Sequence, residues 1–236
     1  MTSRPSLFAR RSLFVAAAAA LLAAATPPPA VAQAFPGKPL KFVVPFSAGS
    51  ATDNLARILA QAMGEQLGQS IAVENRPGAN GILGAEAVKA SAADGYTMLV
   101  TTNTTQAANV SLYKKLSYDP VKDFTPIGKI GVTGFILMVR PDFPAGTMQE
   151  FLAYARANPG KLSFGHGSAG SLVSGALVAS MGGLQVTPVA YKGIPPALTD
   201  LIGGSIQFAF ADVGNAVAQM NGGKLKGLGV TTSRRA

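Results

Sequence analysis

Cysteine is absent from the 236-residue sequence, and histidine occurs once, as His166. The lack of cysteine excludes a disulfide-stabilised scaffold, thiolate metal sites and cysteine catalysis. A single histidine excludes any metal site built from several histidines, and it weakens every Ser–His–Asp triad hypothesis. Charged residues are also few, at 13%, whereas hydrophobic residues make up 48%. Such a chain is too apolar to be disordered, and it is long enough for one large domain or two small ones.

Acidic residues are missing from residues 1–34, which have the composition of an export signal. Three arginines precede a short apolar run, Leu13–Ala25, and the small-residue pattern around Ala32 fits cleavage after Ala34. The apolar run is too short to cross a bilayer, because a transmembrane helix needs about 20 residues. We therefore predict that residues 1–34 are a signal peptide and that the protein is exported.

The remaining chain is modestly basic. Three of the 20 basic residues and none of the 11 acidic residues lie in the signal segment, so 17 basic and 11 acidic residues remain, a net charge of +6. The lysines and arginines are scattered and are not interleaved with aromatic residues, which argues against a nucleic-acid-binding groove. A weak positive field favours the capture of small anions, although solubility alone explains this charge equally well.

Apolar runs of strand length alternate with helical periodicity after the signal segment. A strand at 40–46 precedes a helix at 53–67, and strands at 70–75 and 97–102 flank a helix at 81–90. This β-α-β-α-β order predicts an α/β fold with a mostly parallel sheet and helices on its faces. The helix at 53–67 is expected to bury one face made of Leu55, Ile58, Leu59, Ala62, Met63 and Leu67.

A polar, proline-flanked segment at 119–126 separates this unit from a second α/β unit. A capping-box pattern, Thr147 to Glu150, predicts the start of a helix that ends at Asn158. Strands are expected at 127–132, 135–140, 162–164, 186–190, 206–211 and 225–231, with further helices at 168–181 and 195–202. We therefore predict a first lobe over 35–127, a second lobe over 128–224, and a returning strand or hinge segment over 225–236.

Small and hydroxyl residues gather where several predicted strands end, at 47–53, 101–106 and 163–171. Ligands of parallel sheets bind at the carboxyl ends of strands, and a helix N-terminus offers N–H groups that suit a carboxylate or phosphate. Lys192 and Asp212 also follow predicted strands. Lys192 could be a cationic anchor for a ligand or a surface lysine. Asp212 could accept a hydrogen bond from a ligand or cap the following helix. Ordinary capping and solvated turns explain each loop alone. Together the loops indicate a binding cleft that supplies hydrogen-bond donors and has no acid–base pair.

The segment 163–171 admits two other interpretations. Gly165, Gly167 and Gly170 match the dinucleotide pattern G-x-G-x-x-G, although no acidic residue follows the next strand to bind a ribose. His166 to Gly170 is one residue away from the G-x-S-x-G nucleophile elbow, because His166 occupies the first glycine position. A nucleotide-binding α/β domain and a secreted serine hydrolase that uses Ser168 with His166 are therefore the alternatives to a binding protein.

Six separated blocks carry a resemblance to a known family. They are Val43–Gly49 with Thr52–Arg57, Val73–Gly81 with Gly84–Glu86, Asp94–Thr97, Leu112–Leu116, Tyr118–Pro120, and Tyr191–Gly193 with Pro196–Leu201. In this order, over residues 36–235, the chain resembles the Bug-type substrate-binding proteins of tripartite tricarboxylate transporters.

The resemblance implies a two-lobed fold like the type II periplasmic binding proteins, closing around a small carboxylate and presenting it to membrane permease subunits. It also implies that family members continue past residue 236, in a part that completes the first lobe. We expect a periplasmic monomer that is not an enzyme and binds no cofactor, metal or nucleic acid. Backbone N–H groups, hydroxyls and ordered water would hold the carboxylate. By position, the implied site residues are Ala48, Gly49, Ser50, Thr52, Thr102, Asn103, Gly167, Ser168, Ser171 and Asp212.

Overall fold

The computed structural model describes residues 35–233, so the predicted signal peptide and residues 234–236 lie outside the described residues. The chain divides into two units, Met1–Gly37 and Lys38–Ala236, and all elements described below belong to the second. Among the described residues, no helix combines the length and the apolar character needed to cross a membrane.

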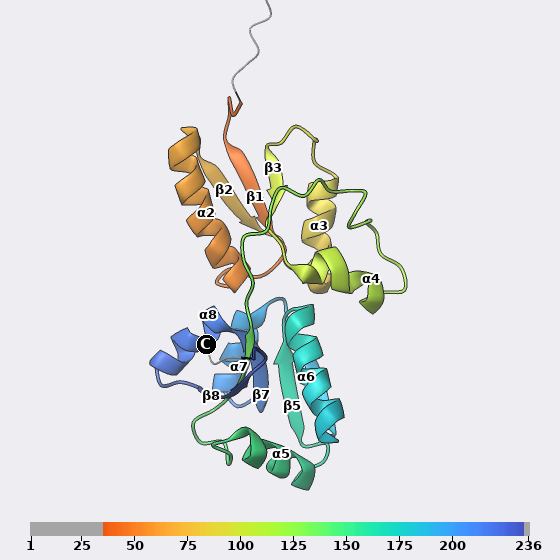
Figure 1. Ribbon diagram of the computed structural model, residues 1–236, viewed down its shortest axis with the longest axis vertical. Coiled ribbons are helices and arrows are strands. Elements are labelled where there is room, and N and C mark those ends of the chain that lie inside the picture. The colour runs from red at the N-terminus through yellow and green to blue at the C-terminus, as the bar shows by residue number, and fades with distance from the viewer. Residues whose placement is uncertain (1–34, 234–236) are drawn as a thin grey trace, which may run out of the picture. The chain divides into compact units, whose positions relative to one another are not determined.

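Three parallel strands form the first sheet, in the order β2-β1-β3 (Figure 1). The strands are β1 (Leu40–Val44), β2 (Ile71–Asn75) and β3 (Thr97–Leu99). Helix α2 (Ala51–Leu67) packs on β1 and β2, and α3 (Ile82–Lys89), entered through the short turn η1 (Ala79–Gly81), packs on β1 and β3. The parallel β-α-β-α-β arrangement predicted from the sequence is confirmed.

The core of this sheet forms where β1 meets α2. Phe42 and Val44, which alternate along β1 and so share a face, pack against Ala56 and Ala60 of the helix. The predicted buried face of the helix is partly wrong, because Leu59 and Met63 join this core but Leu55, Ile58, Ala62 and Leu67 are exposed. The helix is instead oriented by Asp53, which is buried at its first turn. Ala56 and Ala60, three and seven residues after Asp53, therefore lie on the face of the helix that packs on the sheet.

Five strands form the second sheet, in the order β6-β5-β7-β4-β8. The strands are β4 (Phe135–Val139), β5 (Leu162–His166), β6 (Val186–Ala190), β7 (Phe208–Asp212) and β8 (Lys226–Val230). Strand β5 pairs in parallel with β6 and β7, whereas β4 pairs antiparallel with β7 and β8. The helices are α5 (Met148–Ala157), α6 (Ala169–Gly182), α7 (Ile194–Ile202) and α8 (Val213–Asn221).

Alternating side chains of the central strands bury both faces of this sheet. Met138 of β4 and Ala209 of β7 pack with Leu198 of α7 on one face. Their neighbours Leu137 and Phe208 pack on the opposite face, in the core that also contains α5. Figure 1 shows α5 and α6 apart from α7 and α8 around the strands. Helices on both faces leave the carboxyl ends of β5 and β6 free to carry loops.

Two predicted details differ from the structure. The expected strand at 127–132 is wrong, because Ile127 and Val132 are 81% and 90% exposed and the run has no partner strand. A β-branched run becomes a strand only where a neighbour pairs with it, as β7 and β8 do for β4. The segments η2 (Thr104–Ala108) and α4 (Asn109–Leu112) are helical where only a polar strand end was expected. The lobe bounds at 127/128 and 224/225 stay predictions, and β8 belongs to the five-stranded sheet.

Candidate functional site

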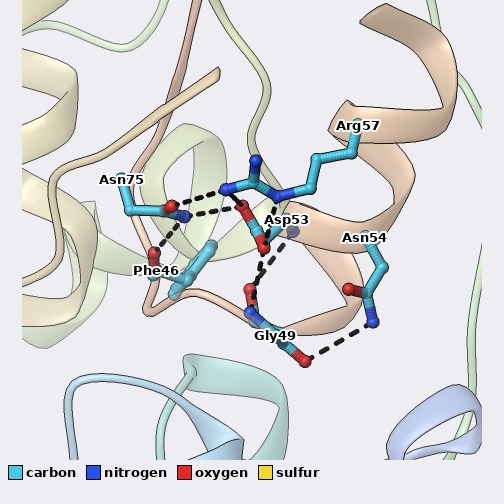
Figure 2. Close-up of polar contacts among 7 residues, drawn as sticks. Phe46, Gly49, Asp53, Asn54, Arg57 and Asn75 are labelled. Carbon is cyan, nitrogen blue, oxygen red and sulfur yellow. Dashed lines mark hydrogen bonds and ion pairs between the residues drawn. The ribbon is translucent and has the colours of Figure 1, made fainter. Parts of the chain in front are cut away.

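The loop that connects β1 to α2 is organised around the buried carboxylate of Asp53 (Figure 2). Ser50 caps the helix, because its Oγ accepts from the Asp53 N–H at 3.2 Å. Oδ2 of Asp53 accepts from the Gly49 N–H at 2.9 Å and from Arg57 Nε at 3.1 Å. Asn75, the last residue of β2, donates through Nδ2 to Oδ1 of Asp53 at 2.8 Å. One carboxylate thus joins the loop, the helix and the neighbouring strand.

The charge of Asp53 changes what this helix N-terminus can bind. Burial opposes ionisation of Asp53, but hydrogen bonds from Arg57, Gly49 and Asn75 outweigh it and hold the pKa of the carboxyl below its usual value. The positive end of the α2 dipole therefore already faces an anion, the protein's own. The amides of Ala48 and Thr52 have no hydrogen-bond partner among the described residues.

The loop from β5 to α6 repeats this design with a hydroxyl in place of the acid. Ser171 Oγ accepts from the Gly167 N–H at 3.1 Å, as Asp53 does from Gly49, and Ser168 Oγ accepts from the Ser171 N–H at 3.3 Å, as Ser50 does from Asp53. The two stretches read Gly-Ser-Ala-Thr-Asp at 49–53 and Gly-Ser-Ala-Gly-Ser at 167–171. The second loop has no carboxylate, so the N-terminus of α6 keeps its partial positive charge.

Side chains and backbone from other loops hold the start of α6 in place. Thr104, in η2, accepts through Oγ1 from the Ala169 N–H at 3.1 Å. Ser47 N–H donates to the carbonyl of Lys192 at 3.2 Å. A Cβ on Gly167 would overlap the backbone of Gly193, and a Cβ on Gly193 would overlap Ser47. The loops after β1, β3, β5 and β6 therefore meet at one place, and glycine is required where their backbones approach most closely.

A cavity of about 260 Å³ lies beside this meeting point. Its lining residues are Pro45, Phe46, Gly78–Gly81, Tyr113, His166, Gly167 and Ala190–Lys192. Lys192 is the one charged residue in this lining, and no carboxylate takes part in it. The volume lies just below the usual range of about 300–1,000 Å³ for ligand pockets, so it suits a small metabolite. The wider hollow of about 650 Å³ between α2 and β2 lies away from the loops and is open to solvent.

The ten predicted site residues are placed in different ways. Gly167 lines the cavity, and Ala48, Gly49 and Asn103 are exposed. The half-buried residues are Thr52, Thr102 and Ser168, and the buried ones are Ser50, Ser171 and Asp212. The structure brings the residues at 48–52 and 167–171 into neighbouring loops and links 102–103 to them through Thr104.

Asp212 has the structural role that the sequence left open. Its Oδ1 accepts from the Asn215 N–H at 3.1 Å, which caps α8, and both its carboxylate oxygens accept from the Asn215 side chain. Those contacts occupy the carboxylate within its own helix turn. In this structure Asp212 is a helix cap.

Sequence reasoning missed the cavity wall formed by Gly78–Gly81. Ala79 and Asn80 have positive φ angles of 47° and 51°, which non-glycine residues rarely adopt. Asn109, fully buried, donates to the Asn80 carbonyl at 3.1 Å, and Asn80 Nδ2 donates to the Tyr113 hydroxyl at 3.1 Å. The glycines at both ends of the segment signal a turn, but the residues that hold it lie about 30 positions away.

The two alternative interpretations of 163–171 find no geometric support. Ser168 Oγ is bonded to Ser171, and the ring of His166 makes no hydrogen bond within the described residues, so no nucleophile–base pair forms there. The glycines of the dinucleotide pattern have packing roles. A Cβ on Gly170 would overlap the Phe135 ring, and one on Gly165 would press on Ile206 at 2.6 Å. Within residues 35–233, no three His, Cys, Asp or Glu side chains gather as a metal site requires.

Comparison with known proteins gives consistent results. The family model described as tripartite tricarboxylate transporter family receptor matches residues 55–236. Protein BugT of Bordetella pertussis is 31% identical over 208 residues, covering 87% of this chain and 64% of BugT. The chain spans 60 to 64% of the length of the curated relatives it matches.

Solved structures with bound ligands are similar in fold. An R. palustris protein described with adipate has a TM-score of 0.83 and 34% identity, covering 85% of this chain and 68% of that one. MatC from Rhodopseudomonas palustris, described with bound malate, has a TM-score of 0.79 and 35% identity, covering 85% and 69%. These neighbours show that the mixed α/β architecture is that of periplasmic binding proteins.

Proposed function

This chain belongs to the tripartite tricarboxylate transporter receptor family, and from that premise we propose that it is a periplasmic solute-binding protein that captures a small carboxylate. The solute would be handed unchanged to membrane permease subunits. Residues 1–34 would direct export and be cleaved after Ala34. The carboxylates named for two structural neighbours, adipate and malate, support the proposed ligand class.

One observation carries the proposal. Loops from both sheets meet around a cavity whose lining has a cation, Lys192, and backbone and side-chain donors, but no carboxylate. A lining with this balance stabilises an anion and would bind a cationic solute poorly. Donors and a cation without a nucleophile–base pair are what a carrier needs to bind a solute and release it unchanged.

The proposed contacts divide by what each residue can offer. The free amides of the first loop, at Ala48 and Thr52, flank Gly49, whose own N–H is held by Asp53. This loop and the polar loop at Thr102 and Asn103 would approach the solute from one side. Gly167 and Ser168, whose hydroxyl can turn its hydrogen toward a ligand, would approach from the other. Ser50, Ser171 and Asp212 would act by fixing the helix starts.

Closure would bring the two sides together. In this proposal lobe 1 (35–127) and lobe 2 (128–224) move about segments near 127–131 and 224–230. The segment 124–134 contains neither helix nor strand, which lets it absorb changes in backbone angle. Small-angle scattering should show a decrease in radius of gyration when a ligand is added.

Thermal denaturation and calorimetry with mono-, di- and tricarboxylates test the proposal. A ligand at 100 times its Kd stabilises the folded state by about 2.7 kcal/mol, which gives a clear rise in Tm. Sodium chloride and sodium sulfate at equal ionic strength control for salt effects. If the protein unfolds cooperatively and no carboxylate changes its Tm or releases heat, the proposed function is wrong.

A further inference from the structure

The single histidine of the chain lies in the cavity wall and has no partner there. His166, the last residue of β5, is 7% exposed, and its Nδ1 is buried without a hydrogen bond. Its ring lies beside that of Phe164, at 6.1 Å between ring centres. A buried polar group without a partner costs about 1–3 kcal/mol. The fold therefore keeps a buried imidazole in the cavity wall at a cost that no hydrogen bond among the described residues offsets.

The accessible nitrogen of the ring is Nε2. Nδ1 is closed off, whereas Nε2 is not, and His166 lines the cavity. Burial lowers the pKa of His166, so the free ring is neutral at pH 7 and carries one N–H. Buried N–H groups without a partner are rarer than buried acceptors without one, which favours the proton on Nε2. The ring therefore presents an N–H donor to the cavity.

The other polar groups of the cavity also favour an electron-rich oxygen. Tyr113 accepts from Asn80 Nδ2, so its own hydrogen remains available to a ligand. Lys192 adds a positive charge. The hydroxyl of Tyr191 is turned to Asp200, to which it donates at 2.7 Å, and burial together with this bond raises the pKa of Tyr191 to about 12. The cavity lining around His166 thus contains donors and one cation, and Asp200, which Tyr191 engages, is not part of this lining.

We propose that His166 determines specificity at the carboxylate site by donating Nε2–H to a second oxygen of the solute. The selected solutes are small dicarboxylates and hydroxycarboxylates, and unsubstituted monocarboxylates of equal length are disfavoured. This inference rests on the proposed function, because it assumes that a first carboxylate is held by the neighbouring loops. Gly167, adjacent to His166, lines the same cavity, so the two sets of contacts are continuous.

Because the sequence has one histidine, a single NMR cross-peak of its ring reports on this contact in protein without a histidine tag. The cross-peak should move when succinate is added and should not move with butyrate. A nearby anionic oxygen favours the charged ring, so succinate should also raise the pH at which the cross-peak titrates. By linkage, succinate should bind more tightly as the pH falls toward the pKa of the His166 ring in the free protein. A wild type that binds succinate with no change in this signal contradicts the proposal.

Two substitutions complete the test. His166→Leu removes the donor, and we expect at least about a tenfold loss of succinate affinity with less than about a twofold change for butyrate. His166→Asn keeps an N–H donor and should retain part of the preference. Equal losses for both ligands in His166→Leu would overturn the proposal while the proposed function stands. If the wild type binds no carboxylate at all, the proposed function itself fails. If His166→Leu does not fold, the wild-type NMR experiment still decides.

Discussion

Two loops of this protein have the same design and differ at one position. In each, a glycine amide and a capping serine bind the residue at the third helical position, which is Asp53 in the first loop and Ser171 in the second. The carboxylate of Asp53 joins the first loop to Arg57 and Asn75, and we call this set of contacts the ionic junction. The hydroxyl leaves the second loop neutral. A helix start that holds its own carboxylate should contribute mainly to stability, whereas a neutral one can receive the carboxylate of a solute.

The two loops differ most in the charge that a bound solute would meet. Two like charges 4 Å apart repel by about 4 kcal/mol at an effective dielectric constant of 20. Arg57 offsets part of this effect at Asp53, but its side chain is half exposed and screened. We therefore expect the solute carboxylate to lie nearer to α6 than to α2.

The largest expected effect is on stability, at the first loop. Asp53→Asn keeps the shape of the side chain but leaves Arg57 without its carboxylate and the Gly49 amide with a weaker partner. We expect the free energy of unfolding to fall by about 3 kcal/mol, measured by chemical denaturation. Asp94→Asn, which breaks an exposed pair with Lys38, is the control and should leave the free energy of unfolding nearly unchanged. Equal effects of the two substitutions would refute the ionic-junction role of Asp53.

The two loops should also differ in their effect on the pH dependence of stability, because only the first contains a titrating carboxylate, that of Asp53. The folded-state pKa of Asp53 is lowered, so its contribution is fully present above the unfolded value of about 3.9 and is lost as the pH falls through the folded value. Wild-type stability should therefore drop more steeply than that of Asp53→Asn on acidification below about pH 5. Ser171→Ala should keep the wild-type slope, because Ser171 does not titrate. Parallel curves for wild type and Asp53→Asn would show that Asp53 makes no such contribution.

A substitution at the contact between loops should affect both stability and binding. Gly167→Ala places a Cβ against the backbone of Gly193, which cannot move as a side-chain end could. We expect about 2 kcal/mol of destabilisation and a loss of carboxylate binding. Gly203→Ala, where a Cβ would meet only ordinary contacts at 3.5 and 3.8 Å, is the matched control and should leave both unchanged. Normal binding by Gly167→Ala would mean that the close approach of these loops is not needed for the site.

The smallest expected change in stability accompanies a specific loss of binding. Ser168→Asp replaces one favourable N-cap residue by another and places a carboxylate at the half-buried start of α6. We expect unfolding free energy within about 0.5 kcal/mol of wild type and at least about a tenfold loss of carboxylate affinity. Ser174→Asp, further along α6, is the control for added charge. Unchanged affinity in Ser168→Asp would contradict the assignment of the solute carboxylate to α6.

Local signals in the sequence predicted much of this fold. Thr147 caps α5, as the capping-box pattern predicted, although Glu150 reaches the Gly146 amide instead of that of Thr147. The parallel order of the first sheet followed from strands separated by helices. These features depend on residues that lie a few positions apart, which is why composition and spacing reveal them.

Features set by distant contacts could not be predicted in this way. The orientation of α2 depends on Asn75, 22 positions from Asp53, and the helical segment after β3 depends on Asn109 and Tyr118. Tyr118 donates to the Thr105 carbonyl at 2.5 Å, and so holds that segment from outside. For the site, the sequence identified the loops but not the place of His166 in the cavity wall, because its burial becomes visible only in the folded chain.

The most direct test of the central claim is a crystal structure of the protein with succinate. We expect one carboxylate within hydrogen-bond distance of the Ser168 hydroxyl, beside Gly167, and the other oxygen-bearing end at His166 Nε2. A carboxylate held by the 47–53 loop alone, or a ligand in the hollow between α2 and β2, would contradict it.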